Sequence, residues 1–296
     1  MPACQPLYTP FHKLIMATPA RLHLSFESVS PGETTLRVKQ QQPPWRVVRG
    51  FRSASGETLA HLHNLSGGIL DTDNLECQLD LGSHAQAQVT STGATRVYRT
   101  RSRDRTAVQR VSARVGAGAY LEFLPDQLIP FSGSRFEQIA SVDLDESASL
   151  IWWDRVAPGR EASGEIFMFH SLAVSFELAV NHEPIAIERW TLDPQSNQPD
   201  SLARLGPFHH FATCYVCRAG EPGSYWRNFE SEMQTLADRL SNPEILWGVS
   251  SLRAHGLVIR GVATSGRALG SGLVEFWKAA KWSLCGRVAT LPRKIH

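Results

Sequence analysis

Residues 85–90 read Ala-Gln-Ala-Gln-Val-Thr, so that small or apolar side chains alternate with polar ones. A period of two places one set of side chains on the buried face of a β-strand and the other set on the opposite face. The same alternation recurs in residues 22–27, 111–115 and 175–180. Turn residues such as Pro31-Gly32 separate these runs. The pattern predicts an extensive antiparallel or mixed β-structure.

Two segments near the C-terminus have helical spacing instead. Apolar residues recur every three or four positions in residues 226–240 and again in residues 269–284. Pro243 follows the first segment and is expected to terminate its helix. We expect each helix to pack an apolar stripe on a sheet, and we expect a long exposed loop at residues 192–208. Four aromatic residues on or near the helices predict an exposed apolar patch of the kind that marks an interface: Trp226, Phe229, Trp277 and Trp282.

Composition places the chain among ordinary globular proteins. It has 296 residues, 42% of them hydrophobic, and a formal net charge of +2. That charge gives no general attraction to nucleic acid or to an anionic membrane, so neither is an expected partner. Five Cys residues do not make a secreted disulfide framework, and the N-terminus lacks the apolar core of a signal peptide. We expect a cytoplasmic protein with a single domain at 18–296, preceded by an extension at 1–17 that is a candidate for disorder.

Few short motifs suggest chemistry. Cys214 and Cys217 form a Cys-x-x-Cys pair behind His209 and His210, but the second ligand pair of a structural zinc site is missing. Partly buried thiols are the favoured interpretation, with a metal site as the alternative. The pair His61 and His63 could bind a metal from one face of a strand or could be a solvated polar face. The chain has no nucleophile elbow and no phosphate-binding loop of the Walker type.

Carboxylates with apolar neighbours are more informative. Five of them follow or interrupt apolar runs: Glu122, Asp126, Asp154, Glu165 and Glu188. Such groups are partly desolvated and need a cation or hydrogen bonds. For any single carboxylate, the simplest explanation of its position is an ion pair with an Arg that is close in sequence. Arg155, Arg160 and Arg189 are the nearby Arg residues. As a group, they predict an interior polar path or a metal route.

A series of blocks along the chain carries a family resemblance. In order, they are Pro43-Pro-Trp-Arg-Val-Val-Arg49, His63-Asn-Leu-Ser-Gly-Gly68, Asp73, Gly93-Ala-Thr-Arg-Val-Tyr-Arg99, Leu121-Glu-Phe-Leu-Pro-Asp126, Gln138, Trp152-Trp-Asp154, Gly164-Glu165, Trp247-Gly-Val-Ser250 and Pro292-Arg-Lys294. Taken together, from about residue 22 to residue 294, they resemble the urease accessory protein UreD family, called UreH in some bacteria.

The resemblance implies a mainly β fold of sheets stacked in a right-handed β-helix-like arrangement, with two α-helices in the C-terminal third. It also implies a maturation factor, not an enzyme, with no permanently bound cofactor and no catalytic residue. The implied partners are the urease apoprotein and a UreF-type protein, which recruits a UreG-type GTPase. Their complex delivers nickel to the urease active site, and the family fold encloses a polar passage proposed to carry the ion.

Nickel in transit needs weak successive ligands, because a strong preformed cage would hold the ion. The candidate positions for such a passage are Asp73, Glu122, Asp126, Asp154, Glu165 and Glu188, with His63 and Thr90 as a second group. Two other functions remain open. The chain could be a pure scaffold that links UreF and UreG to urease without an ion passage. A β-helical hydrolase with a carboxylate pair is the third possibility, although the chain lacks a Gly/Asn-ladder repeat.

Overall fold

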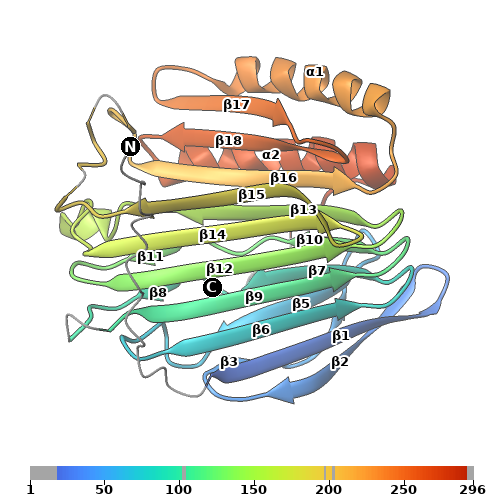
Figure 1. The fold of residues 1–296 in the computed structure, drawn as a ribbon, viewed down its shortest axis with the longest axis horizontal. Helices are drawn as coiled ribbons and strands as arrows, with labels where there is room; N and C mark the ends of the chain where they lie inside the picture. The colour runs from blue at the N-terminus through green and yellow to red at the C-terminus, as the bar shows by residue number, and fades with distance from the viewer. Residues whose placement is uncertain (1–18, 102–104, 197, 202–203, 292–296) are drawn as a thin grey trace, which may run out of the picture.

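The computed structural model describes residues 19–101, 105–196, 198–201 and 204–291. Within these ranges the chain forms two β-sheets and two α-helices (Figure 1). The expected N-terminal extension, residues 1–17, lies outside the described residues, and the single domain at 18–296 stays a prediction.

The first sheet has seven strands, which follow the spatial order β15 (Glu183–Leu192), β14 (Ser171–Val180), β12 (Arg135–Leu144), β9 (Ala107–Val115), β6 (Asn74–Leu81), β1 (Ala20–Ser30) and β2 (Glu33–Gln41). The second sheet follows the order β17 (Ile245–Ser251), β18 (Gly256–Ala263), β16 (His210–Arg218), β13 (Ser149–Val156), β10 (Tyr120–Phe123), β7 (Gln86–Ser91), β5 (Thr58–Asn64) and β3 (Trp45–Arg46). Three short strands attach to the second sheet: β4 (Phe51–Arg52), β8 (Thr95–Val97) and β11 (Leu128–Pro130).

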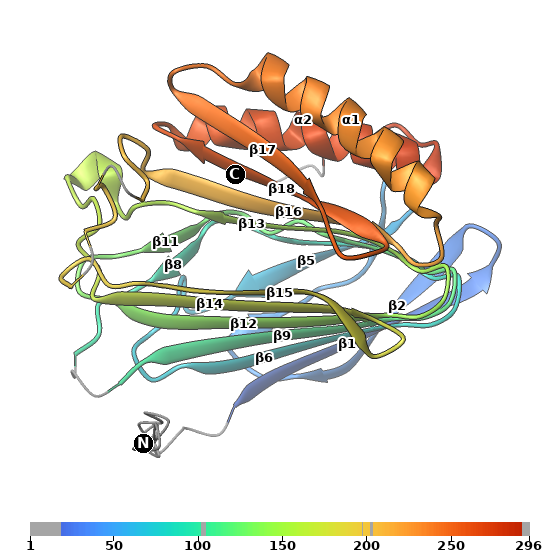
Figure 2. The ribbon, with the colours of Figure 1, turned by 45° about the horizontal axis from the view of Figure 1, so that its top comes forward.

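From β5 to β14 the chain passes repeatedly from one sheet to the other. Strands β5, β7, β10 and β13 are therefore parallel neighbours in the second sheet, and β6, β9, β12 and β14 are parallel neighbours in the first. Parallel neighbours need long crossovers, and here the strand in the opposite sheet belongs to the crossover. The predicted mixed β-structure is confirmed. The sheets remain two separate layers that do not close (Figure 2), so the right-handed β-helix-like arrangement stays a prediction.

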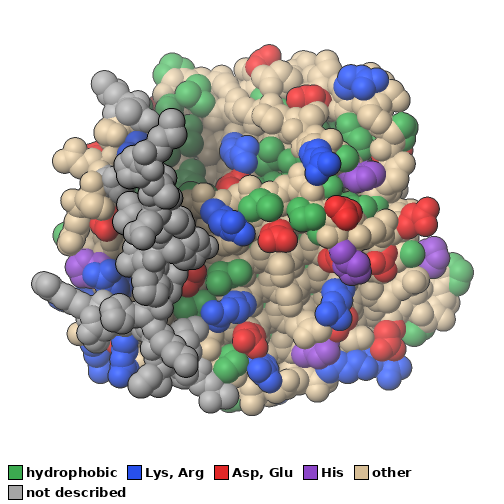
Figure 3. All heavy atoms as spheres, viewed as in Figure 1, with side chains coloured by type: hydrophobic (Ala, Val, Ile, Leu, Met, Phe, Trp, Pro, Cys, Tyr) green, Lys and Arg blue, Asp and Glu red, His purple; other side chains and the backbone are tan. Residues whose placement is uncertain are grey.

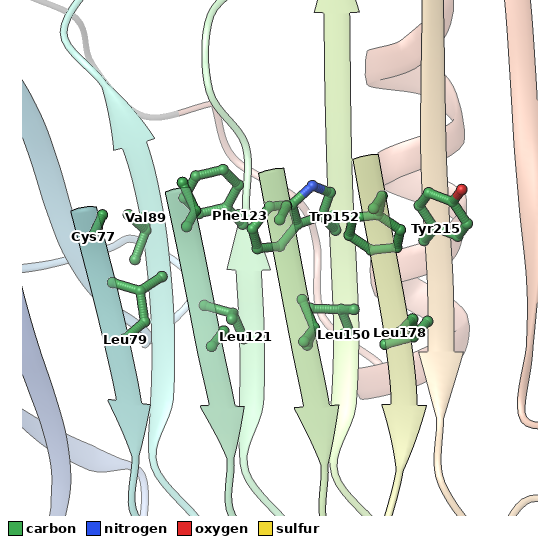
Figure 4. Close-up of a cluster of buried hydrophobic side chains, with 14 of the residues drawn as sticks. Cys77, Leu79, Val89, Leu121, Phe123, Leu150, Trp152, Leu178 and Tyr215 are labelled. Atoms are coloured by element: carbon green, nitrogen blue, oxygen red, sulfur yellow. The ribbon is translucent and has the colours of Figure 1, made fainter. Parts of the chain in front are cut away.

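The main core lies between the two sheets. Strand register aligns five buried side chains across the first sheet, one from each of five neighbouring strands: Leu22, Cys77, Val111, Ala140 and Phe176. Figure 4 shows such residues of both sheets pointing into the space between them, among them Leu79, Leu121, Leu150 and Leu178. The alternation of apolar residues in the sequence therefore corresponds to the inner faces of the two sheets.

Both predicted helices are confirmed and pack on the outer face of the second sheet (Figure 2). They are α1 (Gly223–Leu240) and α2 (Gly266–Cys285). Gly286, directly after α2, has the left-handed conformation that glycine adopts easily and that commonly terminates a helix. Neither helix in the described part of the chain is long and apolar enough to span a membrane. The long loop is also confirmed, because β15 ends at Leu192 and β16 begins at His210.

The predicted exposed aromatic patch on these helices is wrong for three of its four residues. Trp226, Phe229 and Trp277 are buried against the second sheet, and Trp282 is 63% exposed. The periodicity that identified the helices also explains this result, because the aromatic residues lie on the stripe that the sheet covers.

The visible outer face of the first sheet carries charged side chains of both signs with some apolar ones among them (Figure 3), and both α-helices lie on the other sheet (Figure 2). Opposite charges face each other across neighbouring strands here. Arg21 Nε lies 3.0 Å from Glu76 Oε2, and His23 Nε2 lies 2.6 Å from Asp80 Oδ2. Such cross-strand pairs suit a solvated face with both signs of charge interspersed.

Candidate functional site: a carboxylate-lined cavity between the sheets

A cavity of about 300 Å³ lies between the two sheets at the end where β8 and β11 attach. Residues from both layers line it. The charged residues of its lining are Asp126, Asp154, Arg96 and Arg155, and its uncharged polar lining includes Asn64, Ser91, Gln109 and Gln138. Two of the predicted carboxylates, Asp126 and Asp154, therefore share one interior space. The cavity interrupts an otherwise apolar core, in which Phe123 and Trp152 stack with ring centroids 3.9 Å apart.

Strand geometry explains why Asp154 faces this cavity. In β13, Leu150, Trp152 and Val156 belong to the core between the sheets, and Asp154 follows the same alternation. On the facing sheet, Gln138 occupies the inward position between Phe136 and Ala140 of β12. Gln138 Nε2 donates a hydrogen bond to Asp154 Oδ1 at 2.8 Å, so this bond joins the two layers.

Asp154 is an acid held in an unfavourable environment for charge. Burial raises the pKa of Asp154 to about 6, and the nearby carboxylate of Glu188 adds to the increase. Two hydrogen bonds to the carboxylate oppose this effect, one from Gln138 and one from Trp152 Nε1 at 2.9 Å. With this pKa the group is mainly ionised at pH 7 and places negative charge in a small, partly desolvated space. Such a group attracts a cation strongly.

Asp126 supplies the second carboxylate. It lies at the start of the loop after β10, and its backbone N–H donates to Ser91 Oγ at 2.8 Å. Arg155 Nη2 lies 3.8 Å from Asp126 Oδ1. Arg155 passes beneath α2, where a Cβ on Gly270 would lie 2.5 Å from Arg155 Nη1. Burial lowers the pKa of Arg155, and the Asp126 charge opposes that shift.

A second group of polar residues, Tyr215, Glu188 and Arg260, lies outside the cavity lining and reaches the surface. Tyr215 lies on the inner face of β16 and donates its hydroxyl hydrogen to Glu188 Oε2 at 2.8 Å. Arg260 Nη2 of β18 lies 2.6 Å from the same oxygen, and the Arg260 side chain is 53% exposed. Burial raises the pKa of Tyr215, and the carboxylates of Glu188 and Asp154 raise it further. Hydrogen bonds and an ion pair join Tyr215, Glu188 and Arg260, and the charge of Asp154 acts on this group from a distance.

The expected ion pairs with neighbouring Arg residues are confirmed for one carboxylate and wrong for two. Glu165 pairs with Arg160, which lowers the pKa of Glu165. Glu188 instead pairs with Arg260, and Asp154 accepts hydrogen bonds from Gln138 and Trp152. The reason is that consecutive residues of a strand point to opposite faces. Arg189 therefore leaves β15 on the side away from Glu188. Arg155 leaves β13 on the side away from Asp154, and its side chain borders the cavity where it approaches Asp126.

The pH dependence of stability tests the environment of Asp154. Its pKa is raised from 3.8 to about 6 on folding. Between these two pH values the folded chain holds a proton on Asp154 that the unfolded chain has lost. The protonated group therefore contributes to the free energy of unfolding at pH 4, and this contribution disappears as the pH rises through 6. In the wild type, Asp154 should lower the free energy of unfolding by about 2 kcal/mol between pH 4 and pH 7. We expect this decrease to be absent in Asp154→Asn. Urea unfolding across this range measures it.

A matched control is Asp145→Asn, at an exposed position in the turn after β12. The two variants remove the same formal charge, but only position 154 lies in the cavity. Parallel stability curves for the wild type and Asp154→Asn would show that this carboxyl has an ordinary environment, contrary to the structure.

Glu122 and Thr90 lie on the opposite face of the second sheet, beneath α2. Glu122 is fully buried and accepts hydrogen bonds from Gln88 Nε2 at 2.5 Å and from Trp277 Nε1 at 2.8 Å. Lys281 Nζ lies 3.1 Å from Glu122 Oε2. The Thr90 hydroxyl donates to the carbonyl oxygen of Leu124 at 2.7 Å. Both residues already have protein partners, and their role in a nickel passage stays a prediction.

The three other candidates lie away from the cavity lining. Asp73 lies in the turn before β6, where its carboxylate accepts the Leu70 N–H at 3.0 Å, and burial raises its pKa. Glu165 lies after the short 3₁₀ helix at Glu161–Ser163. His63 lines a separate groove beside β4 and β5, together with His61. Their roles as nickel ligands also stay predictions.

Cys214 and Cys217 are separated by the sheet itself. Both are buried free thiols on β16, but Cys214 belongs to the core under the helices and Cys217 to the core between the sheets. Burial raises the pKa of Cys214 to about 12. Two thiols on opposite faces of one strand cannot bind the same ion, which agrees with the favoured interpretation as buried thiols. In the described part of the chain, no group of three or more His, Cys, Asp or Glu residues could hold a metal ion.

Comparison with known proteins gives one consistent family. The model of the family described as UreD urease accessory protein matches residues 18–295. A urease accessory protein UreD of Herpetosiphon aurantiacus is 37% identical over 276 residues, which cover 93% of this chain and 96% of that protein. The urease accessory protein UreD of Pseudomonas fluorescens is 31% identical over 296 residues, covering 99% and 98%. The family match spans almost the whole sequence, and the chain therefore belongs to the UreD family of urease accessory proteins.

Proposed function

We propose that this protein helps to deliver nickel to urease by passing the ion through the cavity between its sheets. The family supports a role in urease maturation and is one of accessory proteins, not of enzymes. The observation that carries the proposal is the cavity between the sheets that Asp126 and Asp154 both line. Glu188, outside this lining, is the next carboxylate on the route that we propose, because its charge raises the pKa of Asp154. The alternation of the chain between the two sheets supports the β-helix-like winding that the resemblance implies.

The chemistry of these groups suits transit. Ni²⁺ accepts oxygen ligands, but single carboxylates and amides spaced along a path bind it less firmly than a cage of His and Cys would. Asp126 and Asp154 offer negative charge in a partly low-dielectric space, and Gln138 and Gln109 offer amide oxygens. Glu188 is already paired with Arg260, so an arriving cation would compete with the guanidinium for this carboxylate.

The partners we propose are the urease apoprotein and a UreF-type protein that recruits a UreG-type GTPase, acting in the cytoplasm. In this assembly the nickel ion is the cargo, and no permanent cofactor is needed. The scaffold alternative has the same partners but no ion inside this chain, so assembly experiments alone do not separate the two functions.

A double substitution along the proposed path separates them. In Asp154→Ala with Glu188→Ala, we expect normal assembly with the partners but nickel delivery to urease that is slower by about tenfold, equal to about 1.4 kcal/mol in the barrier. The reason is that two successive negative charges are removed from the path. Gel filtration measures complex formation, a thermal melt measures folding, and metal analysis measures the nickel content of the activated urease.

The control is Asp143→Ala with Glu177→Ala, which removes two carboxylates from the polar outer face of the first sheet. This variant should deliver nickel at the wild-type rate. Normal nickel content with Asp154→Ala and Glu188→Ala, in a protein that melts and assembles normally, would favour the scaffold function and reject the route.

A further inference from the structure

A second hollow lies on the helix-bearing face of the second sheet, at the end away from α1. The chain that follows α2 reaches this end, where Arg287 Nη1 donates to Gln86 Oε1 at 2.6 Å and lies 3.3 Å from Glu57 Oε1. Beside this segment is a groove of about 960 Å³, lined by β4, β5, the residues between β3 and β4, and Leu291. It differs from the cavity between the sheets, because Thr92 is the one residue common to the two linings among the described residues.

The apolar lining of this groove is open to solvent. Val48 is 64% exposed, Leu291 is 57% exposed and Phe51 is 39% exposed, while Leu59 below them is buried. Large apolar side chains gathered in a hollow and left uncovered mark an interaction site. Since these side chains come from both ends of the described chain, the surface exists only in the folded protein.

The charged lining has one sign. Arg49, Arg52, His61 and His63 line the groove, and no Asp or Glu is among its described lining residues. The guanidinium of Arg49 lies over the Phe51 ring, 4.8 Å from its centroid. Within the described part of the chain, neither Arg49 nor Arg52 forms an ion pair with a carboxylate. These two cations are therefore available to an acidic partner.

We propose that this groove binds an acidic peptide segment of a protein partner, whose apolar side chains cover Val48, Phe51 and Leu291 and whose carboxylates pair with Arg49 and Arg52. Charge complementarity favours this occupant. The undescribed ends of this chain, residues 1–18 and 292–296, carry Lys13, Arg293 and Lys294 but no Asp or Glu, so they would add like charge. A bilayer surface matches a concave groove less well than a peptide does. The proposal does not depend on the nickel route.

The test uses the full chain and a short fluorescein-labelled peptide containing Glu, Leu and Phe, with binding followed by fluorescence anisotropy. We expect binding that weakens with salt and that falls at least about tenfold in Arg49→Glu with Arg52→Glu, because two attractions become repulsions. Val48→Ser with Leu291→Ser should also weaken binding about tenfold through lost apolar contact. Both pairs are surface positions, and a thermal melt confirms that the variants fold.

Arg227→Glu with Arg239→Glu on the exposed side of α1 is the matched control, with the same change in net charge at a distance from the groove. It should bind the peptide as the wild type does. The proposal would be overturned if this control weakened peptide binding as much as Arg49→Glu with Arg52→Glu does. It would also be overturned if a peptide with Gln in place of Glu bound the wild type as tightly as the acidic peptide. It would also be overturned if vesicles of anionic phospholipid bound with the same dependence on Arg49 and Arg52 while the peptide did not bind.

Discussion

Lys281→Met is expected to destabilise the folded chain by about 3–5 kcal/mol, because it leaves two buried carboxylates without their shared cation. Lys281 is fully buried on α2, and its Nζ lies 3.2 Å from Glu57 Oε2 and 3.1 Å from Glu122 Oε2. All three side chains have no exposed surface. Burial by itself would raise the pKa of Glu57, but hydrogen bonds from Ser53 and Ser55 and the charge of Lys281 lower it to about 2.

Urea unfolding at pH 7 measures this loss. Lys278→Met provides the control, because Lys278 lies on the same helix, is about half exposed and pairs with Glu275 within one turn. Such a surface pair contributes about 0–1 kcal/mol. Neutralising the three fully buried members, with Lys281→Met, Glu57→Gln and Glu122→Gln together, should recover much of the loss, because the remaining cation, Arg287, is partly exposed and keeps its hydrogen bond to Gln86. If Lys281→Met alone were as stable as the wild type, the cluster would not anchor α2.

Gly261→Ala is expected to cost about 3 kcal/mol, although alanine ordinarily suits a strand at least as well as glycine. Gly261 lies in β18 directly against the indole of Trp247 in β17, and a Cβ there would lie 2.3 Å from the ring. The indole cannot retreat easily, because a Cβ on Gly272 of α2 would also lie 2.6 Å from it and Phe276 packs at 4.9 Å between ring centroids. Glycine at these positions makes the slot into which Trp247 fits.

Thermal and urea unfolding of Gly261→Ala measure the cost. The control is Gly248→Ala in the adjacent strand, where a Cβ would meet nothing within 4 Å. Combining Gly261→Ala with Trp247→Leu should show coupling, so that the double variant is more stable than the sum of the two single effects predicts. Additive effects would mean that the alanine does not collide with the indole.

Much of the fold followed from local pattern. The period of two in residues 22–27 and 111–115 identified strands whose apolar side chains, such as Leu24 and Val111, are buried between the sheets. The helical period at 269–284 identified α2, and Lys281 falls on the same stripe, four residues after Trp277. A charged residue on an apolar stripe signals a buried ion pair. That signal was present in the sequence, but it did not contribute to the prediction of the site.

The candidate site was predicted in part. Asp126 and Asp154 lie in one cavity as a polar path requires, but Gln138, Tyr215 and Arg260 were missed as members of the site. For Gln138 a usable signal existed, because a polar residue at an inward position of β12 breaks the apolar alternation. For Arg260 no local signal existed, since its partner Glu188 is 72 positions away in the sequence.

The sequence by itself determined which residues form strands and helices, which face of each strand is apolar, and the family to which the chain belongs. The tertiary structure alone decided the partners of the buried charges. Periodicity assigns a side chain to a face, but the residue that lies opposite depends on how separate layers are aligned. Glu122 therefore meets Lys281 from 159 positions away, and Asp154 meets Gln138 across the two sheets. Their neighbours in sequence could not show this, because successive side chains of a strand point in opposite directions.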